Sequence, residues 1–353
     1  MKYLSVCSGI EAASNAWEPL GWEPEAFSEI EPFPSAVLKH HWPKVQNLGD
    51  MTKHEQWNIQ SGTIDLLVGG TPCQSFSVAG LRQGLKDPRG NLMLTYLAIA
   101  ERLKPRWLVW ENVPGVLSSN GGKDFGSFLG ALGELGYEWA YRVLDAQWFG
   151  VAQRRRRVFV VAHLGKGNLA AKVLFESESV CRNSTPSREA GQRIATDVEA
   201  GAGSCEGVGA FRMQAFGEYA DDGTASAMKA RDYKDATDLI TSPVVIDRAA
   251  FNQGENAQYK PHIEHSETMD SLVARGPHAV SVPADRMAVR RLTPRECERL
   301  QGFPDDHTLI QWRNKPADQC PDGPRYKALG NSMAVPCMAW IGKRIDAIER
   351  NMK

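Results

Sequence analysis

The sequence lacks the features of a membrane-embedded or disulfide-stabilised protein. Among its 353 residues, no apolar run approaches the ~18 residues that a membrane-spanning helix needs. The N-terminal residues lead directly into a motif, so we expect no signal peptide. The seven cysteines are scattered and include no Cys-x-x-Cys pair, which argues against both a disulfide framework and a zinc site. This cysteine usage predicts a reducing, cytoplasmic location.

The chain also lacks an excess of charge of either sign, since its formal net charge is −1. A strongly basic domain, the usual sign of nucleic-acid binding, is therefore absent. The charges are unevenly distributed: residues 166–287 carry a net −5, and the remainder carries +4. Basic residues cluster at 154–157 and at 290–299. Such clusters are often solvated surface, but they can also form a cleft that binds a polyanion.

Apolar runs alternate with helical patterns through residue 165, which predicts an α/β fold with a parallel sheet. One of these runs, residues 64–68, is followed by Gly69-Gly70-Thr71-Pro72 and then by Cys73. In open α/β sheets, the residues that bind ligands and catalyse reactions lie at the carboxyl ends of the strands. Cys73 is therefore in the place of a nucleophile, although a lone cysteine is more often a small buried hydrophobe.

The pattern breaks from about residue 166 and returns near residue 290. Within the break, Thr224–Arg231 resembles Thr268–Arg275, and each copy ends in an arginine. A capping box at Thr293–Glu296 predicts a helix to about residue 301. Residues 326–332 are interpreted as a polar turn, and residues 334–351 as a last amphipathic helix.

Six short blocks, in this order, resemble the DNA (cytosine-5) methyltransferases of bacteria and phages. They are Cys7-Ser8-Gly9-Ile10, Gly70–Ser77, Glu111-Asn112-Val113, Gln153–Arg157, Arg291–Glu296 and Gly330-Asn331-Ser332. The resemblance covers almost the whole chain outside 166–287. It implies a Rossmann-like S-adenosylmethionine-dependent methyltransferase domain at 1–165, a smaller target-recognition domain at 166–287, and a segment at 288–353 that completes the catalytic domain.

The resemblance also implies a mechanism. Carbon 5 of cytosine is a poor nucleophile, and a thiolate that adds to carbon 6 activates it. Cys73 would be that thiolate, and Glu111 would donate a proton or hydrogen bond to ring N3. Arg155 and Arg157 would hold the base, the backbone and the catalytic loop. The target base would leave the duplex, and the loop 74–91 would close over it.

The cofactor implied is S-adenosyl-L-methionine, with expected contacts from Cys7, Ser8, Gly9, Ile10, Glu29, Ile30, Asp50, Met51, Pro72 and Asn331. The chain departs from the family's usual pattern at two of its positions. Cys7 replaces an aromatic residue, and Glu11 replaces a glycine. The partner implied is double-stranded DNA, with expected contacts from Gln74, Ser77, Gln153, Arg231, Arg275 and Arg290. Phosphate contacts are expected from clusters 154–157 and 290–299. Base readout is expected from Arg231 and Arg275, which end the two similar segments.

Two alternatives stay open at this point. A tRNA cytosine-5 methyltransferase shares the fold, but its usual Cys-Phe-Thr block is missing here. A catalytically silent DNA-binding regulator is the other alternative, although the joint retention of Cys73, Glu111 and the arginines speaks against it. The sequence has no Asp/Asn-Pro-Pro-Tyr/Phe turn of an amino-methyltransferase and no zinc-deaminase signature. We expect no metal, no membrane contact and a monomer in function, with a role in restriction-modification or in a phage.

Overall fold

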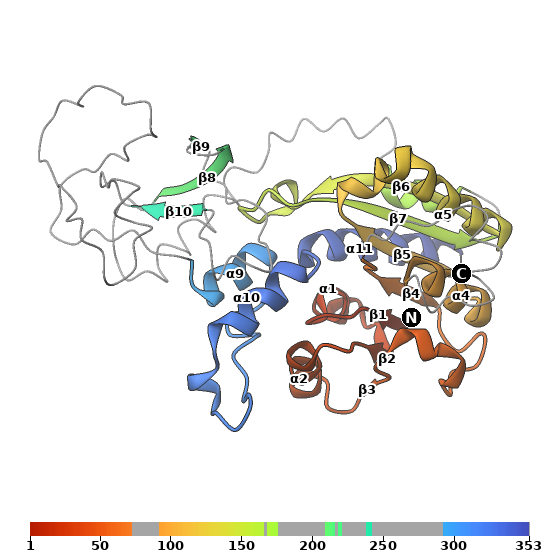
Figure 1. Cartoon of the computed structure of the whole chain (residues 1–353). Coiled ribbons are helices and arrows are strands. Elements are labelled where there is room, and N and C mark those ends of the chain that lie inside the picture. Colours follow the sequence, from red (N-terminus) through yellow and green to blue (C-terminus); the bar gives the residue numbers. More distant parts are fainter. Residues whose placement is uncertain are drawn as a thin grey trace, which may run out of the picture.

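A computed structural model describes residues 1–72, 92–165, 168–175, 209–215, 218–220, 238–241 and 292–352. Its main feature is a seven-stranded sheet with strand order β3-β2-β1-β4-β5-β7-β6 (Figure 1). The strands are β1 (Lys2–Val6), β2 (Glu23–Ser28), β3 (Gln46–Asn47), β4 (Leu66–Gly69), β5 (Trp107–Asn112), β6 (Tyr137–Asp145) and β7 (Arg156–Leu164). The helices around it are α1 (Ala12–Trp17), α2 (Pro32–His41), α4 (Leu92–Leu103), α5 (Lys123–Glu134), α6 (Leu169–Leu174) and α11 (Val335–Met352).

The sheet is mixed, so the prediction of a wholly parallel sheet was wrong for its last two strands. Strands β1 to β5 pair in parallel, whereas β7 is antiparallel to both β5 and β6. Residues 146–155 alone connect β6 to β7. A parallel crossover needs roughly a dozen residues or more, so this short connection forces the two strands into a hairpin-like pair.

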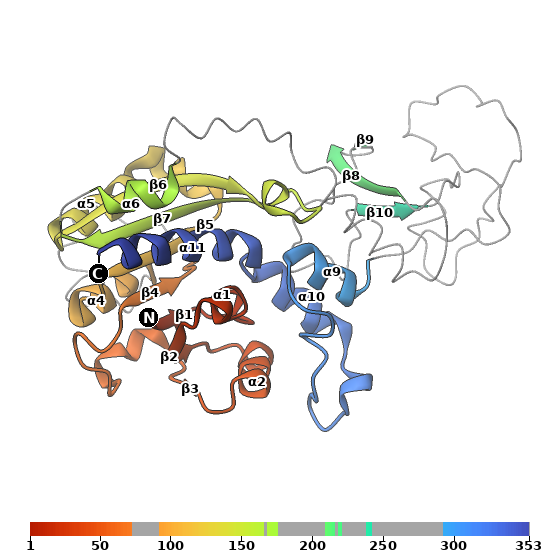
Figure 2. The ribbon, with the colours of Figure 1, turned by 180° about the vertical axis from the view of Figure 1, so that it is seen from behind.

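Side chains alternate between two apolar layers along the central strands. Leu66 and Val68 of β4 belong to one buried cluster, and Leu67 between them belongs to the other. The first cluster includes residues of α1, α6 and α11, and the second includes residues of α4 and α5. Helices α4 and α5 face the viewer in Figure 1, and α11 faces the viewer in Figure 2. The fold is therefore a three-layer α/β/α arrangement, as a strand buried on both faces requires.

The two ends of the chain belong to one domain. Helix α11 packs against α1, and Trp17 Nε1 donates a hydrogen bond to the Met338 carbonyl at 2.8 Å. A Cβ at Gly342 would lie 2.4 Å from the Trp17 ring, so this close packing requires glycine. Trp107 Nε1 donates to Glu349 Oε1 at 2.8 Å and fixes the far end of α11. The C-terminal helix thus completes the layer that covers the first strands.

The segment after residue 291 contains α9 (Pro294–Gln301) and α10 (Asp322–Asn331). The Thr293–Glu296 capping box is present, and Gly302 ends α9 with φ 77°. The expected polar turn at 326–332 was wrong, because these residues form most of α10 and its C-cap. Ala328 and Leu329 are buried in the core, and this burial favours a helix over a solvated turn.

Candidate active site

The carboxyl ends of β4 and β5 lie side by side and create the first part of the site. Gly69 pairs with Trp110, and Asn112 Nδ2 donates to the Thr71 carbonyl at 2.8 Å. Trp110 Nε1 donates to Thr71 Oγ1 at 3.0 Å. A Cβ at Gly70 would lie 3.1 Å from Glu111 Oε2, so glycine allows the chain to pass close to this carboxylate. The backbone is therefore fixed directly before Pro72 and Cys73.

Glu111 forms the acidic centre of the site. Its side chain is buried at the end of β5, and its Oε1 lies 3.0 Å from Arg157 Nε on the adjacent strand β7. Burial raises the pKa of Glu111, while the guanidinium groups of Arg157 and Arg155 oppose this rise. The net shift is upward, which is the direction that a proton donor near neutral pH requires.

Arg155 joins the active-site strands to the end of α10. Its Nη2 donates to the carbonyls of Gly330 and Ser332 at 3.1 and 2.6 Å, which flank Asn331. Burial, with a smaller contribution from the nearby charge of Arg157, lowers the pKa of this guanidinium to about 9. Arg155 is buried and therefore positions the loop around Asn331, while Arg154 and Arg156 on either side of it are exposed.

The loop after β1 and the end of β2 form the second part of the site. Glu29 Oε2 accepts from the Gly9 amide at 2.8 Å, and its Oε1 accepts from the Glu31 amide at 2.7 Å. These two bonds hold the carboxylate against the loop. Asp50 Oδ1 accepts from the Thr52 amide at 2.9 Å and caps η2 (Met51–Gln56). The predicted acidic residues are thus placed at adjacent strand ends.

Cys7 and Met51 form a sulfur contact in this second part. Cys7 Sγ lies 3.4 Å from Met51 Sδ, and burial raises the pKa of the Cys7 thiol to about 12. The neutral thiol is therefore an apolar wall residue. Cys7 is at the position where the family's usual pattern has an aromatic side chain, and Met51 is its sulfur neighbour.

A cavity of about 830 Å³ connects the two parts. Most of the predicted catalytic and cofactor residues with described structure line it: Cys7, Gly9, Glu29, Ile30, Asp50, Met51, Pro72, Glu111, Arg155, Arg157 and Asn331. Ser8 lines a smaller neighbouring cavity, whereas the Ile10 side chain is fully buried in the core. Gln153, predicted to contact DNA, is also fully buried, so its side chain is not on the surface in this conformation.

Several lining residues were missed from the sequence. Phe33 and Trp312 meet edge-to-face with ring centroids 5.2 Å apart, and Lys327 Nζ lies 2.9 Å from Glu31 Oε2. Both pairs connect α2 to the C-terminal segment. These contacts join residues almost 300 positions apart, so no local sequence pattern predicts them. The only signal in the sequence is an aromatic residue, Trp312, within a polar stretch.

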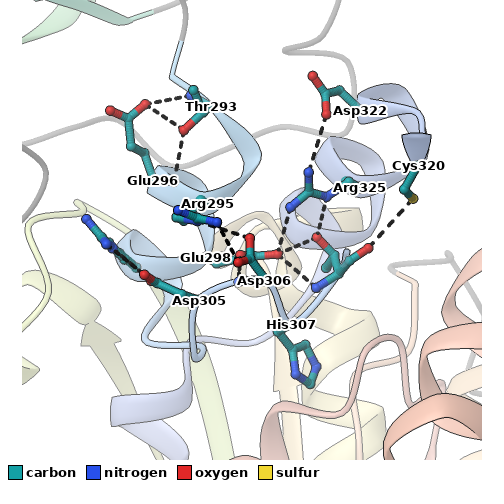
Figure 3. Close-up of polar contacts among 12 residues, drawn as sticks. Thr293, Arg295, Glu296, Glu298, Asp305, Asp306, His307, Cys320, Asp322 and Arg325 are labelled. Carbon is teal, nitrogen blue, oxygen red and sulfur yellow. Dashed lines mark hydrogen bonds and ion pairs between the residues drawn. The ribbon is translucent and has the colours of Figure 1, made fainter. Parts of the chain in front are cut away.

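Two arginines of the 290–299 cluster, Arg295 and Arg299, are paired with aspartates. Arg295 pairs with Asp306 through two hydrogen bonds (Figure 3). Arg299 pairs with Asp305 in the same way. Below them, the buried Glu298 accepts from the Thr308 amide and from Arg325. The two arginines therefore stabilise the segment after α9, and their charges are already matched by aspartates.

The same segment supports the loop after β1. His307 Nε2 lies 2.9 Å from the Ile10 carbonyl, and the His307 ring stacks on His41 at 4.2 Å. Burial lowers the pKa of His307 to about 4, so this imidazole is neutral near pH 7. The backbone of Ile10 thus has a structural role in holding the loop, in place of a side-chain contact with the cavity.

Several predicted residues lie outside the described residues. They are Cys73, Gln74, Ser77, Arg231, Arg275 and Arg290, together with the loop 74–91. Within 166–287, β8 (Gly209–Ala215), β9 (Glu218–Ala220) and β10 (Asp238–Thr241) form a separate antiparallel sheet. Among the described residues, no helix is long and apolar enough to cross a membrane. The same part of the chain contains no cluster of three or more His, Cys, Asp or Glu suited to a metal ion.

Comparison with known proteins assigns the chain to a family. Residues 1–347 match the family described as C-5 cytosine-specific DNA methylase, and this chain belongs to it. Membership confirms the enzyme class predicted from the six blocks, a DNA (cytosine-5-)-methyltransferase, and the methyl donor, S-adenosylmethionine. It also confirms the Rossmann-like methyltransferase fold.

Individual relatives add detail. The chain is 43% identical to "DNA N-6-adenine-methyltransferase" of Escherichia phage P1, over 97% of this chain and 61% of that protein. It is 28% identical to "Type II methyltransferase M2.BsuMI" of Bacillus subtilis, over 98% of this chain and 75% of that protein. The structure of a Dnmt2 methyltransferase from S. pombe aligns with a TM-score of 0.57 at 15% identity, over 100% of this chain and 99% of that chain. The last similarity supports the fold alone.

Proposed function

We propose that this chain methylates carbon 5 of a cytosine that is flipped out of a specific double-stranded DNA sequence, through a covalent bond between Cys73 and the base. The observation that carries the proposal is the single cavity shared by Glu111, Arg157 and the predicted cofactor residues. Pro72 lines this cavity, and Cys73 is the next residue in the sequence. A methyl donor and a target base can therefore meet beside the thiol and the Glu111 carboxyl.

The residues fit the cofactor. The cavity of about 830 Å³ is of the size that holds a drug-sized ligand. Glu29 and Asp50 offer carboxylate oxygens for hydroxyl and amine groups, and the side chain of Ile30 is 69% exposed for apolar contact with a ring. S-adenosylmethionine supplies an electrophilic methyl group there and leaves as S-adenosylhomocysteine.

The chain's own groups perform the remaining steps. The Cys73 thiolate adds to carbon 6 of cytosine, while Glu111 stabilises the added electron density through a proton or hydrogen bond to N3. Carbon 5 would then take the methyl group of the bound donor. The proton on carbon 5 would pass to a solvent water, and the electron pair of that C–H bond would re-form the 5,6 double bond and expel the Cys73 thiolate. Arg157 holds Glu111 and limits the rise of its pKa.

Replacement of the nucleophile tests this proposal. Cys73→Ala should abolish methyl transfer while DNA binding survives, because the side chain forms a bond only during the reaction. Tritium transfer from labelled S-adenosylmethionine and a DNA-binding assay would be measured on the same preparation. Methylation within about tenfold of wild type would exclude Cys73 as the nucleophile.

The name of the phage P1 relative raises adenine N-6 methylation as a second candidate. That name belongs to a longer protein of which this chain spans 61%. The present sequence has no Asp/Asn-Pro-Pro-Tyr/Phe turn, and its family match concerns cytosine carbon 5. Duplexes in which every cytosine or every adenine is replaced by an unreactive analogue separate the two activities: only loss of cytosine should stop tritium transfer.

Sequence readout is assigned to the region 166–287, where Arg231 and Arg275 are the candidates for base contact. Arginine donates two hydrogen bonds to guanine in the major groove, the commonest specific contact. Arg231→Ala or Arg275→Ala should lower discrimination at one position of the site by about 1–3 kcal/mol. Arg290→Ala should weaken binding evenly across sequences. Methylation profiles on a random-sequence DNA library would be compared; a folded variant with the wild-type profile removes its arginine from readout.

A further inference from the structure

Glu11 is a buried carboxylate whose second oxygen has no hydrogen-bond partner among the described residues. The residue precedes α1 with φ 65°, and its side chain is 1% exposed. Oε1 accepts from the Ser14 amide and hydroxyl at 3.1 and 3.2 Å, and the Ser14 hydroxyl lies 2.6 Å from the Tyr3 hydroxyl. Oε2 is buried and has no partner within hydrogen-bond limits in the described part of the chain. One oxygen of this carboxyl is thus held by Ser14, and the nearby Ser5 hydroxyl is the other polar group of the chain that favours its charged form.

The described part of the chain places no positive charge against Glu11. Among residues 1–72, 92–165 and 292–352, no Lys, Arg or His forms an ion pair with it. Burial raises the pKa of Glu11 to about 7; hydrogen bonds from Ser5 and Ser14 oppose this rise, and the charge of Glu29 adds a smaller increase. An acidic residue this deeply buried is almost always paired. A cationic ligand from outside the chain would offset the free-energy cost of burying this unpaired carboxylate.

A small cavity adjoins this carboxyl and opens toward the larger one. It has a volume of about 40 Å³, and its lining includes Glu11, Ser5, Ser8, Glu111, Asn331 and Ser332. The two cavities share Cys7, Gly9, Gly70, Glu111 and Asn331. A space of this size holds one small polar group, since a single water needs roughly 10–15 Å³ by this measure. It cannot contain a purine ring.

We propose that Glu11 binds the α-ammonium group of the amino-acid part of S-adenosylmethionine. This inference rests on the methyl donor named in the proposed function. The ammonium is the only group of that molecule with a positive charge and N–H donors. The sulfonium has no N–H, and the adenine amine is neutral. An N–H from the ammonium satisfies the unpartnered oxygen, and its charge supplies the missing cation.

The position of the small cavity agrees with this assignment. The methyl-bearing sulfur has two other arms, one to adenosine and one to the amino acid. The methyl must face the base beside Glu111, and the adenosine is assigned to the side of Glu29 and Asp50. The amino-acid arm then takes the direction that remains, toward Asn331 and the small cavity. Glu11 thus becomes a cofactor-specificity residue at a position where the family usually has glycine.

Calorimetric titration of the full chain with two ligands tests the proposal. S-adenosylhomocysteine carries the ammonium, and its deaminated analogue, S-adenosyl-4-thiobutyric acid, lacks it. Glu11→Gln should weaken binding of S-adenosylhomocysteine about tenfold or more and binding of the analogue less than about twofold. Glu11→Gly gives a second variant whose backbone suits the positive φ. Glu23→Gln, an exposed residue of β2, is the matched control and should alter neither affinity.

Equal weakening of both ligands by Glu11→Gln and Glu11→Gly would show a purely structural role and overturn the proposal. Unchanged affinity for S-adenosylhomocysteine in Glu11→Gly would also overturn it. The proposed function fails in a different way: a wild-type chain that binds S-adenosylhomocysteine through its ammonium but does not methylate DNA contradicts the function alone. A chain that methylates DNA while both variants bind both ligands like wild type contradicts the Glu11 assignment alone.

Discussion

Glu11 after β1 and Glu111 at the end of β5 are both buried carboxylates on the same small cavity, but among the described residues only Glu111 has a cationic partner. Glu111 lies 3.0 Å from Arg157 Nε, whereas Glu11 has one oxygen without a partner in the described structure. Burial raises the pKa of both. The difference indicates that the protein controls the protonation of Glu111 itself and leaves Glu11 to be neutralised by a ligand. The two ends of the cavity would then serve chemistry and cofactor binding separately.

The largest expected effect is at the chemical end. Glu111→Gln should lower the rate of methyl transfer by about 10²–10⁴, because glutamine keeps the size but cannot donate the same proton. Affinity for S-adenosylhomocysteine and for DNA should change much less. Single-turnover tritium transfer at saturating cofactor gives the rate, and titration gives the affinities. If the rate of methyl transfer is unchanged and the affinities are weakened, Glu111 binds a ligand and takes no part in the chemical step.

The next effect concerns the stability of the cofactor-free chain. The pKa of Glu11 in the folded state, about 7, lies above its ordinary value of 4.5, so folding retains a proton between these pH values. The free energy of unfolding should therefore fall as pH rises from 5 through 7, by at most about 3 kcal/mol from this residue. Glu11→Gln removes that contribution.

Urea unfolding at pH 5 and pH 8 measures this difference. Relative to wild type, Glu11→Gln should be more stable at pH 8 than at pH 5, and Glu23→Gln should follow wild type at both. Tyr3 and Glu29 are the titratable neighbours that act on Glu11, and they are present in all three proteins. Parallel pH profiles for wild type and Glu11→Gln would show that Glu11 is not a protonated buried acid.

A third variant removes the cationic partner of Glu111, so that Glu111, like Glu11, lacks an ion pair among the described residues. Arg157→Leu removes the guanidinium that opposes the rise in the pKa of Glu111, so that pKa should move higher. Glu111 then stays protonated to higher pH, and the alkaline limb of the methylation rate should shift upward. Arg156→Leu, at the exposed neighbouring position, is the control. If the alkaline limb stays in place in Arg157→Leu, it reports a group other than Glu111.

The smallest effect concerns the passage of the chain past Glu111. A Cβ at Gly70 would lie 3.1 Å from both Glu111 Oε2 and Met333 Cε, which is tight. Gly70→Ala should cost about 1 kcal/mol of stability, since the neighbours have to move slightly. Gly115→Ala places its Cβ in open space and is the comparison. Thermal unfolding of the Gly70→Ala and Gly115→Ala proteins measures this loss of stability. Equal melting temperatures would mean that Glu111 and Met333 can shift to accommodate the added methyl group without cost.

The sequence predicted those features whose signals are local. The capping box at Thr293, the end of its helix near residue 301 and the strand before Gly70 each depend on residues close in the chain. The six blocks predicted the family, which the comparison confirms. The cavity then brings most of the predicted residues together, including Asp50 and Asn331 from opposite ends of the chain.

The features that sequence reasoning missed depend on tertiary burial. Gln153 was expected to contact DNA because it belongs to one of the six family blocks, and in this conformation it is fully buried. Arg295 and Arg299 were expected to contact phosphates, but aspartates that follow the helix pair with them. Glu11 was visible only as an unusual residue in place of glycine. Its burial and its unpartnered oxygen come from packing, which no spacing in the chain reveals.

The central claim is tested most directly by the identity of the methylated nucleoside. The purified full-length chain would be incubated with unmethylated duplex DNA and S-adenosylmethionine, and the digested DNA would be analysed by mass spectrometry. We predict 5-methylcytosine from wild type and none from Cys73→Ala. The appearance of N6-methyladenine, or of 5-methylcytosine with the Cys73→Ala protein, would contradict the account.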